Sequence, residues 1–141
     1  MISFKNKNIL ITGASGFIGS ALKTVLQEAG HAVASVSRNK GADIEWNPNK
    51  GAIDKPAFEG LDAVIHLAGA GIADRRWSKP VKQQILESRT KGTQLLSTAL
   101  ASLQSPPNVL LSGSAIGYYG ERGNEKLTET SRKGEGFLSN V

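Results

Sequence analysis

Residues 8–20, Asn-Ile-Leu-Ile-Thr-Gly-Ala-Ser-Gly-Phe-Ile-Gly-Ser, constrain the fold of this chain more than any other stretch. The apolar run at 9–11 is typical of a strand buried on both faces, and a helical pattern begins at residue 21. Between them, Gly13, Gly16 and Gly19 allow a tight turn, close approach of a pyrophosphate to the backbone, and close packing of helix on strand. Free N–H groups at the helix start favour negative charge. The stretch therefore predicts a dinucleotide site; the alternative is that the glycines merely punctuate a strand–helix turn.

The composition excludes several classes of protein. A chain of 141 residues with 39% hydrophobic content is sufficient for one packed domain. Because it has no cysteine and only two histidines, disulfides, thiol chemistry and a His-rich metal site are excluded, and we expect no metal. No apolar run approaches the roughly 20 residues of a membrane span, and residues 1–5 run straight into the first strand without a signal peptide. We therefore expect a cytoplasmic protein that binds no membrane.

The net charge of +5 has two explanations. Lys and Arg are scattered rather than gathered in one stripe, so binding of nucleic acid is not expected. The densest cluster comprises Arg75, Arg76, Lys79 and Lys82, at an expected loop-to-helix junction. It is either a solvated surface or a means of attracting an anionic cofactor or substrate.

The order of elements predicts a parallel sheet. Expected strands cover residues 9–11, 32–36, 62–68 and 109–111, with a further short strand at 44–46. A long helix is expected from Ser78-Lys79-Pro80 until Ser105-Pro106-Pro107. Strands separated by helices pair in parallel with right-handed crossovers. The fold class is therefore α/β, a Rossmann-like doubly wound sheet of order 3-2-1-4, with 62–68 as strand 3. In that order the glycine turn and the loop 112–120 face each other across one cleft.

The last residues indicate an incomplete fold. Residues 137–141 read as a helix that is interrupted without a stop signal, and the strand at 109–111 would be an uncovered edge. We expect residues 1–141 to form one dinucleotide-binding domain, the amino-terminal part of a longer protein from which the substrate-binding part is absent. The open edge favours a homo-oligomer, which truncation itself could induce.

The end of the second strand bears on the choice of dinucleotide. Residues 36–40, Val-Ser-Arg-Asn-Lys, contain no carboxylate that could accept hydrogen bonds from a ribose 2′-hydroxyl. The guanidinium of Arg38 can instead bind a 2′-phosphate through two hydrogen bonds. This pattern predicts NADP(H), the alternative being a surface arginine beside a loop. Asp62 could contact the adenine side or simply cap a turn, and His66 is expected to be a buried structural histidine.

Four segments, residues 12–19, 62–69, 92–96 and 112–120, resemble the short-chain dehydrogenase/reductase superfamily in its extended, NAD-dependent epimerase/dehydratase branch. Further matches at 46–48, 51–54, 69–78, 88–89 and 114–120 are similar to an atypical subfamily described as nucleoside-diphosphate-sugar epimerases. The resemblance implies the NADP(H)-binding domain of a sugar-nucleotide epimerase or oxidoreductase. The expected cofactor-binding residues are Gly13, Ser15, Gly16, Phe17, Ile18, Gly19, Ser37, Arg38, Leu67, Ala68, Gly69, Ala70, Ser112 and Gly113.

The catalytic residues of the family are matched only in part. Extended members use a Ser or Thr after the fourth strand and a Tyr-x-x-x-Lys pair on the next helix, which moves a proton while the nicotinamide moves a hydride. Ser114 matches the serine and Tyr119 a following Tyr-Gly, whereas Phe137 and Leu138 stand where the tyrosine of the pair is expected. Arg89 stands where extended members commonly carry Asn.

Two functions therefore stay open. Ser114 and Tyr119 are the catalytic candidates of an NADP-dependent enzyme acting on a small, nucleotide-sugar-like substrate; their other interpretation is a turn hydroxyl and a cleft-wall aromatic. The absence of the Tyr-x-x-x-Lys pair favours the alternative, a non-catalytic NADP(H)-binding redox sensor or regulatory protein.

Overall fold

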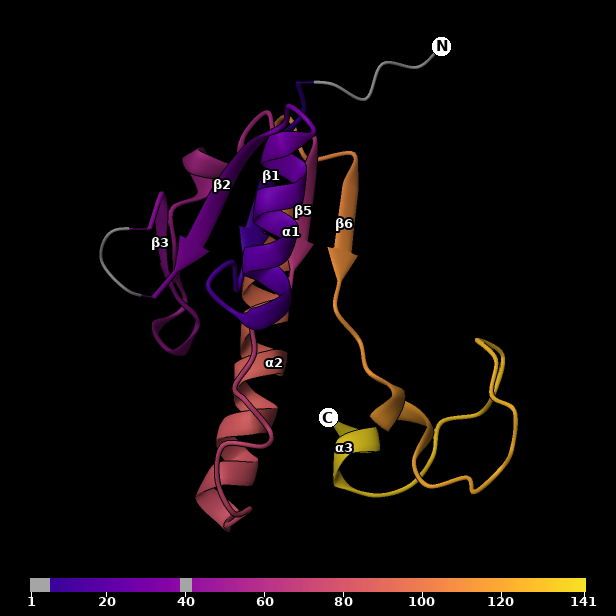
Figure 1. Ribbon diagram of the computed structural model, residues 1–141. Coiled ribbons are helices and arrows are strands. Elements are labelled where there is room, and N and C mark those ends of the chain that lie inside the picture. Colours follow the sequence, from indigo (N-terminus) through magenta and orange to yellow (C-terminus); the bar gives the residue numbers. More distant parts are fainter. Residues whose placement is uncertain (1–5, 39–41) are drawn as a thin grey trace.

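The computed structural model describes residues 6–38 and 42–141 as one mixed sheet with helices packed on it (Figure 1). The strands are β1 (Asn8–Thr12), β2 (Ala32–Ser37), β3 (Ile44–Asn47), β4 (Ala52–Ile53), β5 (Ala63–His66) and β6 (Val109–Ser112). Their order is β4-β3-β2-β1-β5-β6, and every neighbouring pair is parallel except β3 and β4. The expected parallel, Rossmann-like sheet is confirmed.

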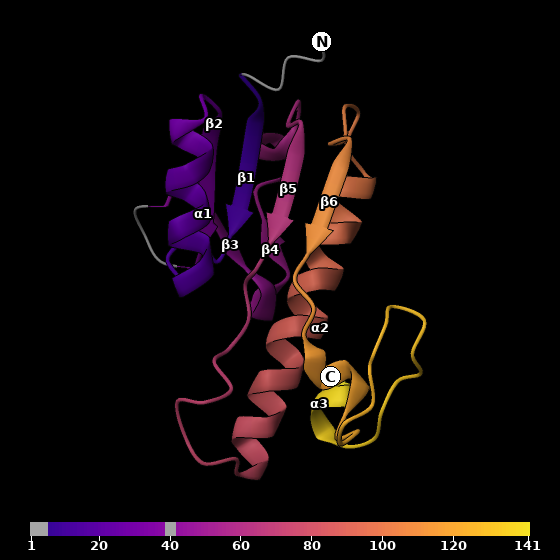
Figure 2. The same ribbon diagram turned by 45° about the vertical axis from the view of Figure 1, so that its right-hand side comes forward.

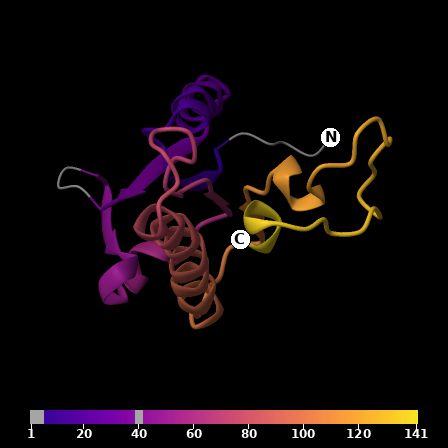
Figure 3. The same cartoon turned by 90° about the horizontal axis from the view of Figure 1, so that it is seen from below.

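Two long helices cover opposite faces of this sheet, α1 (Phe17–Glu28) and α2 (Lys79–Ala101), as the view in Figure 3 shows. The main core lies on the α2 side, where Leu96 and Leu100 pack with residues of β1, β2, β3 and β5. Phe58, in the turn η2 (Lys55–Phe58), is completely buried there. The start of α2 agrees with the prediction, although the Ser78 side chain makes no capping hydrogen bond.

The predicted neighbours of two strands are wrong. Residues 63–66 pair with β1, and the strand next to β2 is the short β3. Ile44 and Trp46 are buried and alternate with the exposed Glu45 and the half-buried Asn47, so this four-residue segment is a full member of the sheet. The chain then crosses through β4 and η2 to the other side of β1 before β5 begins. The expected order holds for the parallel strands once β3 is counted as strand 3 and β5 as strand 4.

The corrected strand order changes which loops are neighbours at the carboxyl edge of the sheet. Because β5 lies between β1 and β6, the glycine turn after β1 is separated from the loop 112–120 by the end of β5. Figure 2 shows β1, β5 and β6 side by side with the carboxyl ends of all three at one edge. The expectation that those two loops face each other across one cleft is therefore wrong.

β6 is an open edge of the sheet, as expected. Val109, Leu110 and Leu111 are 45%, 43% and 56% exposed. The chain continues through the turn η3 (Ile116–Tyr119) to α3 (Phe137–Asn140), which packs on η3 (Figure 1). A helix at residue 137 is thus confirmed, whereas self-association through β6 stays a prediction. Among the helices of the described residues, none combines the length and the apolar character that crossing a membrane requires.

Candidate functional site

The glycine turn has the shape that the sequence predicts. Gly13 has a φ of +73°, and a Cβ atom there would lie 2.9 Å from the backbone nitrogen of Ala68. A Cβ atom on Gly19 would overlap the carbonyl oxygen of Gly13, so only glycine lets α1 pack this closely. Gly16 is the N-cap of α1 and provides no side-chain cap, which leaves N–H groups of the first turn free for an anion. The tight turn and the close packing are confirmed; contact with a pyrophosphate stays a prediction.

A cavity of about 520 Å³ lies beside this turn, at the carboxyl ends of the parallel strands. Its walls come from the glycine turn, the ends of β2 and β3, the loop after β5 and the amino-terminal half of α2. The lining residues are Gly13, Ser15, Val36, Ser37, Arg38, Trp46, Pro48, Asn49, Ala68, Gly69, Ala70, Pro80, Gln83, Gln84, Glu87 and Ser88. The fold therefore brings seven of the predicted cofactor-binding residues, from three separate segments, into one cavity.

Charge in this cavity favours an anionic ligand at one end. Arg38 is exposed and lines the cavity. Glu87 is the one carboxylate among the lining residues, and it is held by Lys91 Nζ at 2.7 Å and by the Gln83 amide, both of which lower its pKa. Asp43, further along the chain, accepts hydrogen bonds from Ser35, which lower the pKa of its carboxyl group, and does not line the cavity.

The end of β2 thus presents Ser37 and Arg38 to the cavity without an acidic neighbour of its own strand. Asn39 and Lys40, which formed part of the sequence argument, lie outside the described residues.

A buried hydrogen-bond network supports the floor of the site. His66 is 4% exposed, and its Nδ1 lies 2.6 Å from the Thr12 hydroxyl, which accepts from the backbone N–H of Ala68 at 3.2 Å. Its Nε2 lies 3.1 Å from the hydroxyl of Thr93 on α2, and its ring meets Trp46 edge-on. Burial lowers the pKa of His66 and so favours the neutral ring. The expected structural role of His66 is confirmed: it ties β1, β5 and α2 together beneath the cavity.

The other predicted site residues lie outside the cavity. Phe17 and Ile18 are 95% and 66% exposed on α1. The remaining predicted residues that do not line it are Gly16, Gly19, Leu67, Ser112, Gly113, Ser114 and Tyr119. Gly113 N donates to the carbonyl of His66 at 2.9 Å, so the start of the loop 112–120 lies beside the end of β5. Their functional roles stay predictions.

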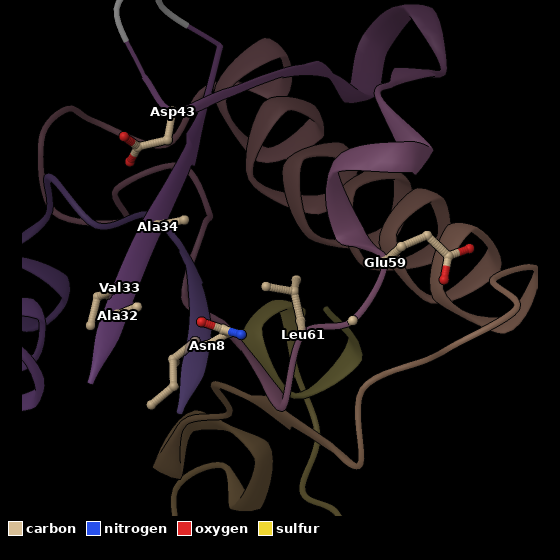
Figure 4. A pocket seen from close by; sticks show the side chains of 9 residues that line it. Asn8, Ala32, Val33, Ala34, Asp43, Glu59 and Leu61 are labelled. Atoms are coloured by element: carbon tan, nitrogen blue, oxygen red, sulfur yellow. The ribbon is translucent and has the colours of Figure 1, made fainter. Parts of the chain in front are cut away.

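Asp62 does not belong to the site. At the opposite, amino-terminal edge of the sheet it accepts from Lys7 Nζ at 2.9 Å and from Asn8 N at 2.8 Å, and these bonds lower its pKa. The interpretation that it contacts adenine is therefore wrong, and its role is to hold the start of β1. A second hollow, of about 340 Å³, lies at that edge (Figure 4).

Several lining residues were missed from the sequence. Four of them recur at helical spacing on one face of α2: Pro80, Gln83, Gln84 and Glu87. The last three are polar, which is usual on a solvated face. Trp46 and Asn49 were not predicted either, because β3 had no assigned neighbour in the sheet. No pattern in the sequence marks them, because they reach the cavity only through the position of α2 and of β3 at the carboxyl edge.

Comparison with known proteins agrees with this geometry. Residues 9–136 match the model of the NAD dependent epimerase/dehydratase family. The epimerase family protein Mb2239 of Mycobacterium bovis is 40% identical over 139 residues, covering 96% of this chain and 46% of the relative. The crystal structure of human epimerase family protein SDR39U1 with NADPH superposes with a TM-score of 0.83 at 32% identity, over 94% of this chain and 45% of that one.

A nucleoside-diphosphate sugar epimerase from Corynebacterium glutamicum gives a TM-score of 0.78 at 33% identity, over 96% of this chain and 28% of that one. The chain thus spans less than half the length of these relatives. It belongs to the NAD dependent epimerase/dehydratase family.

Proposed function

We propose that this chain binds NADP(H) in the cavity at the carboxyl edge and is the cofactor-binding part of a short-chain dehydrogenase/reductase-type enzyme. One observation carries the proposal: Gly13 of the glycine turn and Arg38 line the same cavity. The first can receive a pyrophosphate on free backbone N–H groups, and the second can receive a 2′-phosphate. On the side of the glycine turn away from Arg38, Ala68, Gly69 and Ala70 after β5 provide a wall of small residues for the rest of the dinucleotide.

The preference for the phosphorylated cofactor rests on charge. An acidic residue at the end of β2 would accept hydrogen bonds from a ribose 2′-hydroxyl and repel a phosphate, whereas Arg38 offers a guanidinium. The human relative whose fold matches this chain was crystallised with NADPH, which supports the same choice.

For the complete protein we propose hydride transfer to or from a carbonyl or hydroxyl of a nucleotide-sugar-like substrate, the bound dinucleotide supplying or accepting the hydride. The similarity to a nucleoside-diphosphate sugar epimerase supports this substrate class. Ser114 is the candidate for polarising the substrate oxygen by a hydrogen bond, and Tyr119 for moving the proton. The second candidate function is a non-catalytic NADP(H)-binding sensor, favoured by Phe137 and Leu138 where the family's Tyr-x-x-x-Lys begins.

The test is a fluorescence titration of this chain with NADPH and with NADH, repeated on Arg38→Ala. We expect NADPH to bind at least about tenfold more tightly than NADH, a difference of about 1.4 kcal/mol that one charge-assisted contact can supply. Arg38→Ala should abolish this difference without weakening the binding of NADH. Arg132→Ala is the matched control, because it removes the same charge from an exposed position outside the cavity. Equal affinity for both dinucleotides in the unmodified chain would contradict the proposal. Turnover of NADPH with a panel of carbonyl compounds by the full-length protein separates the enzyme from the sensor.

A further inference from the structure

The wall of the cavity formed by the loop after β5 is fastened to α2 by two adjacent side chains. The Ser88 hydroxyl accepts from the backbone N–H of Ala70 at 3.0 Å, and Arg89 Nη1 donates to the carbonyl oxygen of Ala70 at 3.1 Å. The backbone N–H and the carbonyl of Ala70 are therefore both hydrogen-bonded to side chains of α2. Such double attachment of one loop residue fixes the orientation of its backbone.

The two fastening side chains are themselves fixed. Ser88 Oγ donates to the carbonyl of Ile85 at 2.9 Å, and Arg89 Nη1 also reaches that carbonyl at 3.2 Å. Arg89 Nη1 lies 3.4 Å from Ser88 Oγ, which completes a closed set of hydrogen bonds. In the part of the chain that the structure describes, no carboxylate pairs with Arg89. The guanidinium is therefore committed to backbone carbonyls rather than to an ion pair.

Gly69 fits directly over this guanidinium. A Cβ atom at position 69 would lie 3.1 Å from Cζ and 3.3 Å from both terminal nitrogens of Arg89. Contacts this short require the guanidinium to move by a few tenths of an ångström, and its hydrogen bonds to Ala70 and Ile85 oppose such a move. The absence of a side chain at position 69 and the presence of Arg89 are thus two parts of one arrangement.

The arrangement determines what the cavity offers to a ligand. Gly69 and Ala70 line it, yet the N–H and carbonyl of Ala70 are occupied by α2. At Ala70 the wall therefore offers the cavity no free N–H donor, and its carbonyl oxygen already accepts from Arg89. Such a surface suits a flat ring or a sugar edge held by van der Waals contact.

We infer that Ser88 and Arg89 are positioning residues for the dinucleotide: they hold the Ala70 peptide bond against α2 and so set the shape of the cavity wall. The inference rests on the proposed function. It assigns a role to Arg89, which stands at the position where the family resemblance implies an asparagine.

The main experiment measures NADPH binding to the unmodified chain, to Ser88→Ala and to Thr90→Ala. Thr90 is the matched control because its hydroxyl donates to the carbonyl of Leu86 at 3.0 Å on the same helix but lies outside the cavity. Loss of one hydrogen bond that orders the wall is expected to weaken NADPH binding by roughly three- to tenfold in Ser88→Ala. Thr90→Ala should bind as the unmodified chain does, and both variants should show similar resistance to urea. Equal affinity in Ser88→Ala would overturn the inference.

A double-mutant cycle tests the role of Arg89. Gly69→Ala should weaken NADPH binding more strongly in the unmodified background than in the Arg89→Ala background. In the Arg89→Ala background there is no guanidinium for the new Cβ atom to displace. Additive effects would show that the two residues do not act together and would overturn the assignment of Arg89.

A third measurement needs no variant. The Ala70 amide of the unmodified chain should exchange its hydrogen slowly in the absence of NADPH, because it donates to Ser88. Rapid exchange would overturn the inference even if a variant failed to fold. If the unmodified chain bound no NADPH, the proposed function would fail; if it bound NADPH and the Ala70 amide exchanged rapidly, only the positioning role would fail.

Discussion

The two edges of the central sheet use their polar groups in opposite ways. At the amino-terminal edge, the carboxylates serve the chain itself: Asp62 binds Lys7 and Asn8, and Glu59 accepts from the backbone N–H groups of Gln104 and Ser105 at 2.9 and 2.8 Å. Figure 4 shows the Glu59 carboxylate pointing away from the hollow at this edge.

At the carboxyl edge, the cavity is lined by four polar residues, Ser15, Arg38, Asn49 and Gln84, whose side chains make no hydrogen bond or ion pair within the described residues. The carboxylates at the amino-terminal edge are thus bound within the chain, whereas these four side chains at the carboxyl edge can contact a ligand without breaking a bond of the fold.

The largest expected effect comes from adding one methyl group at each edge. Gly19→Ala places a Cβ atom against the carbonyl of Gly13, so it should cost about 2–3 kcal/mol of unfolding free energy and weaken NADPH binding by more than about tenfold. Gly30→Ala, near the amino edge, has no atom within 4 Å of the new Cβ and only the strain of a φ of +88°, about 1–2 kcal/mol. Urea unfolding and NADPH titration measure both variants. Loss of NADPH binding in Gly30→Ala, with normal binding in Gly19→Ala, would reverse the comparison.

A smaller effect is expected in the pH dependence of stability, which should differ between groups at the two edges. His66, under the carboxyl edge, has a pKa lowered from 6.5 by burial, so the unfolded chain binds its proton more readily than the folded chain. Its contribution to stability is complete above about pH 6.5 and is lost as the pH falls towards the lower folded pKa, by up to about 1.4 kcal/mol per pH unit. At the amino edge, Asp62 and Asp43 have pKa values lowered from 3.8, so their contribution is lost only as the pH falls below that value.

Urea unfolding of the unmodified chain and of His66→Gln between pH 7 and pH 5 measures this difference. The unmodified chain should lose more stability over this range than His66→Gln, in which position 66 no longer titrates. Parallel pH profiles would show that the buried network does not depend on a neutral histidine.

The sequence predicted features that depend on local pattern. The turn at Gly13, the close packing at Gly19 and the start of α2 follow from residue types that permit few other conformations. The neighbour of residues 62–68 could not be predicted, because the apolar pattern of a buried strand does not indicate on which side of β1 the strand pairs. That choice depended on β3, whose four residues form a strand too short for its pattern to show its place in the sheet.

The candidate site divides in the same way. Gly13, Arg38 and the small residues 68–70 follow strand ends and could be expected at the carboxyl edge. Trp46, Gln83 and Gln84 reach the cavity only because β3 joins the sheet and α2 passes across this edge. For Asp62 the sequence left two interpretations open, and the fold decided between them. The direction of β5 places this side chain at the amino-terminal edge, away from the cavity.

The most direct test of the central claim is hydrogen–deuterium exchange of this chain with and without NADPH. We predict that NADPH slows exchange in the glycine turn at 13–19 and at Gly69, and leaves residues 32–34 and 59–61 unchanged; the Ala70 amide, which donates to Ser88, should be slow in both states. Protection at 32–34 and 59–61, or no protection anywhere, would contradict the assignment of the carboxyl edge as the cofactor site.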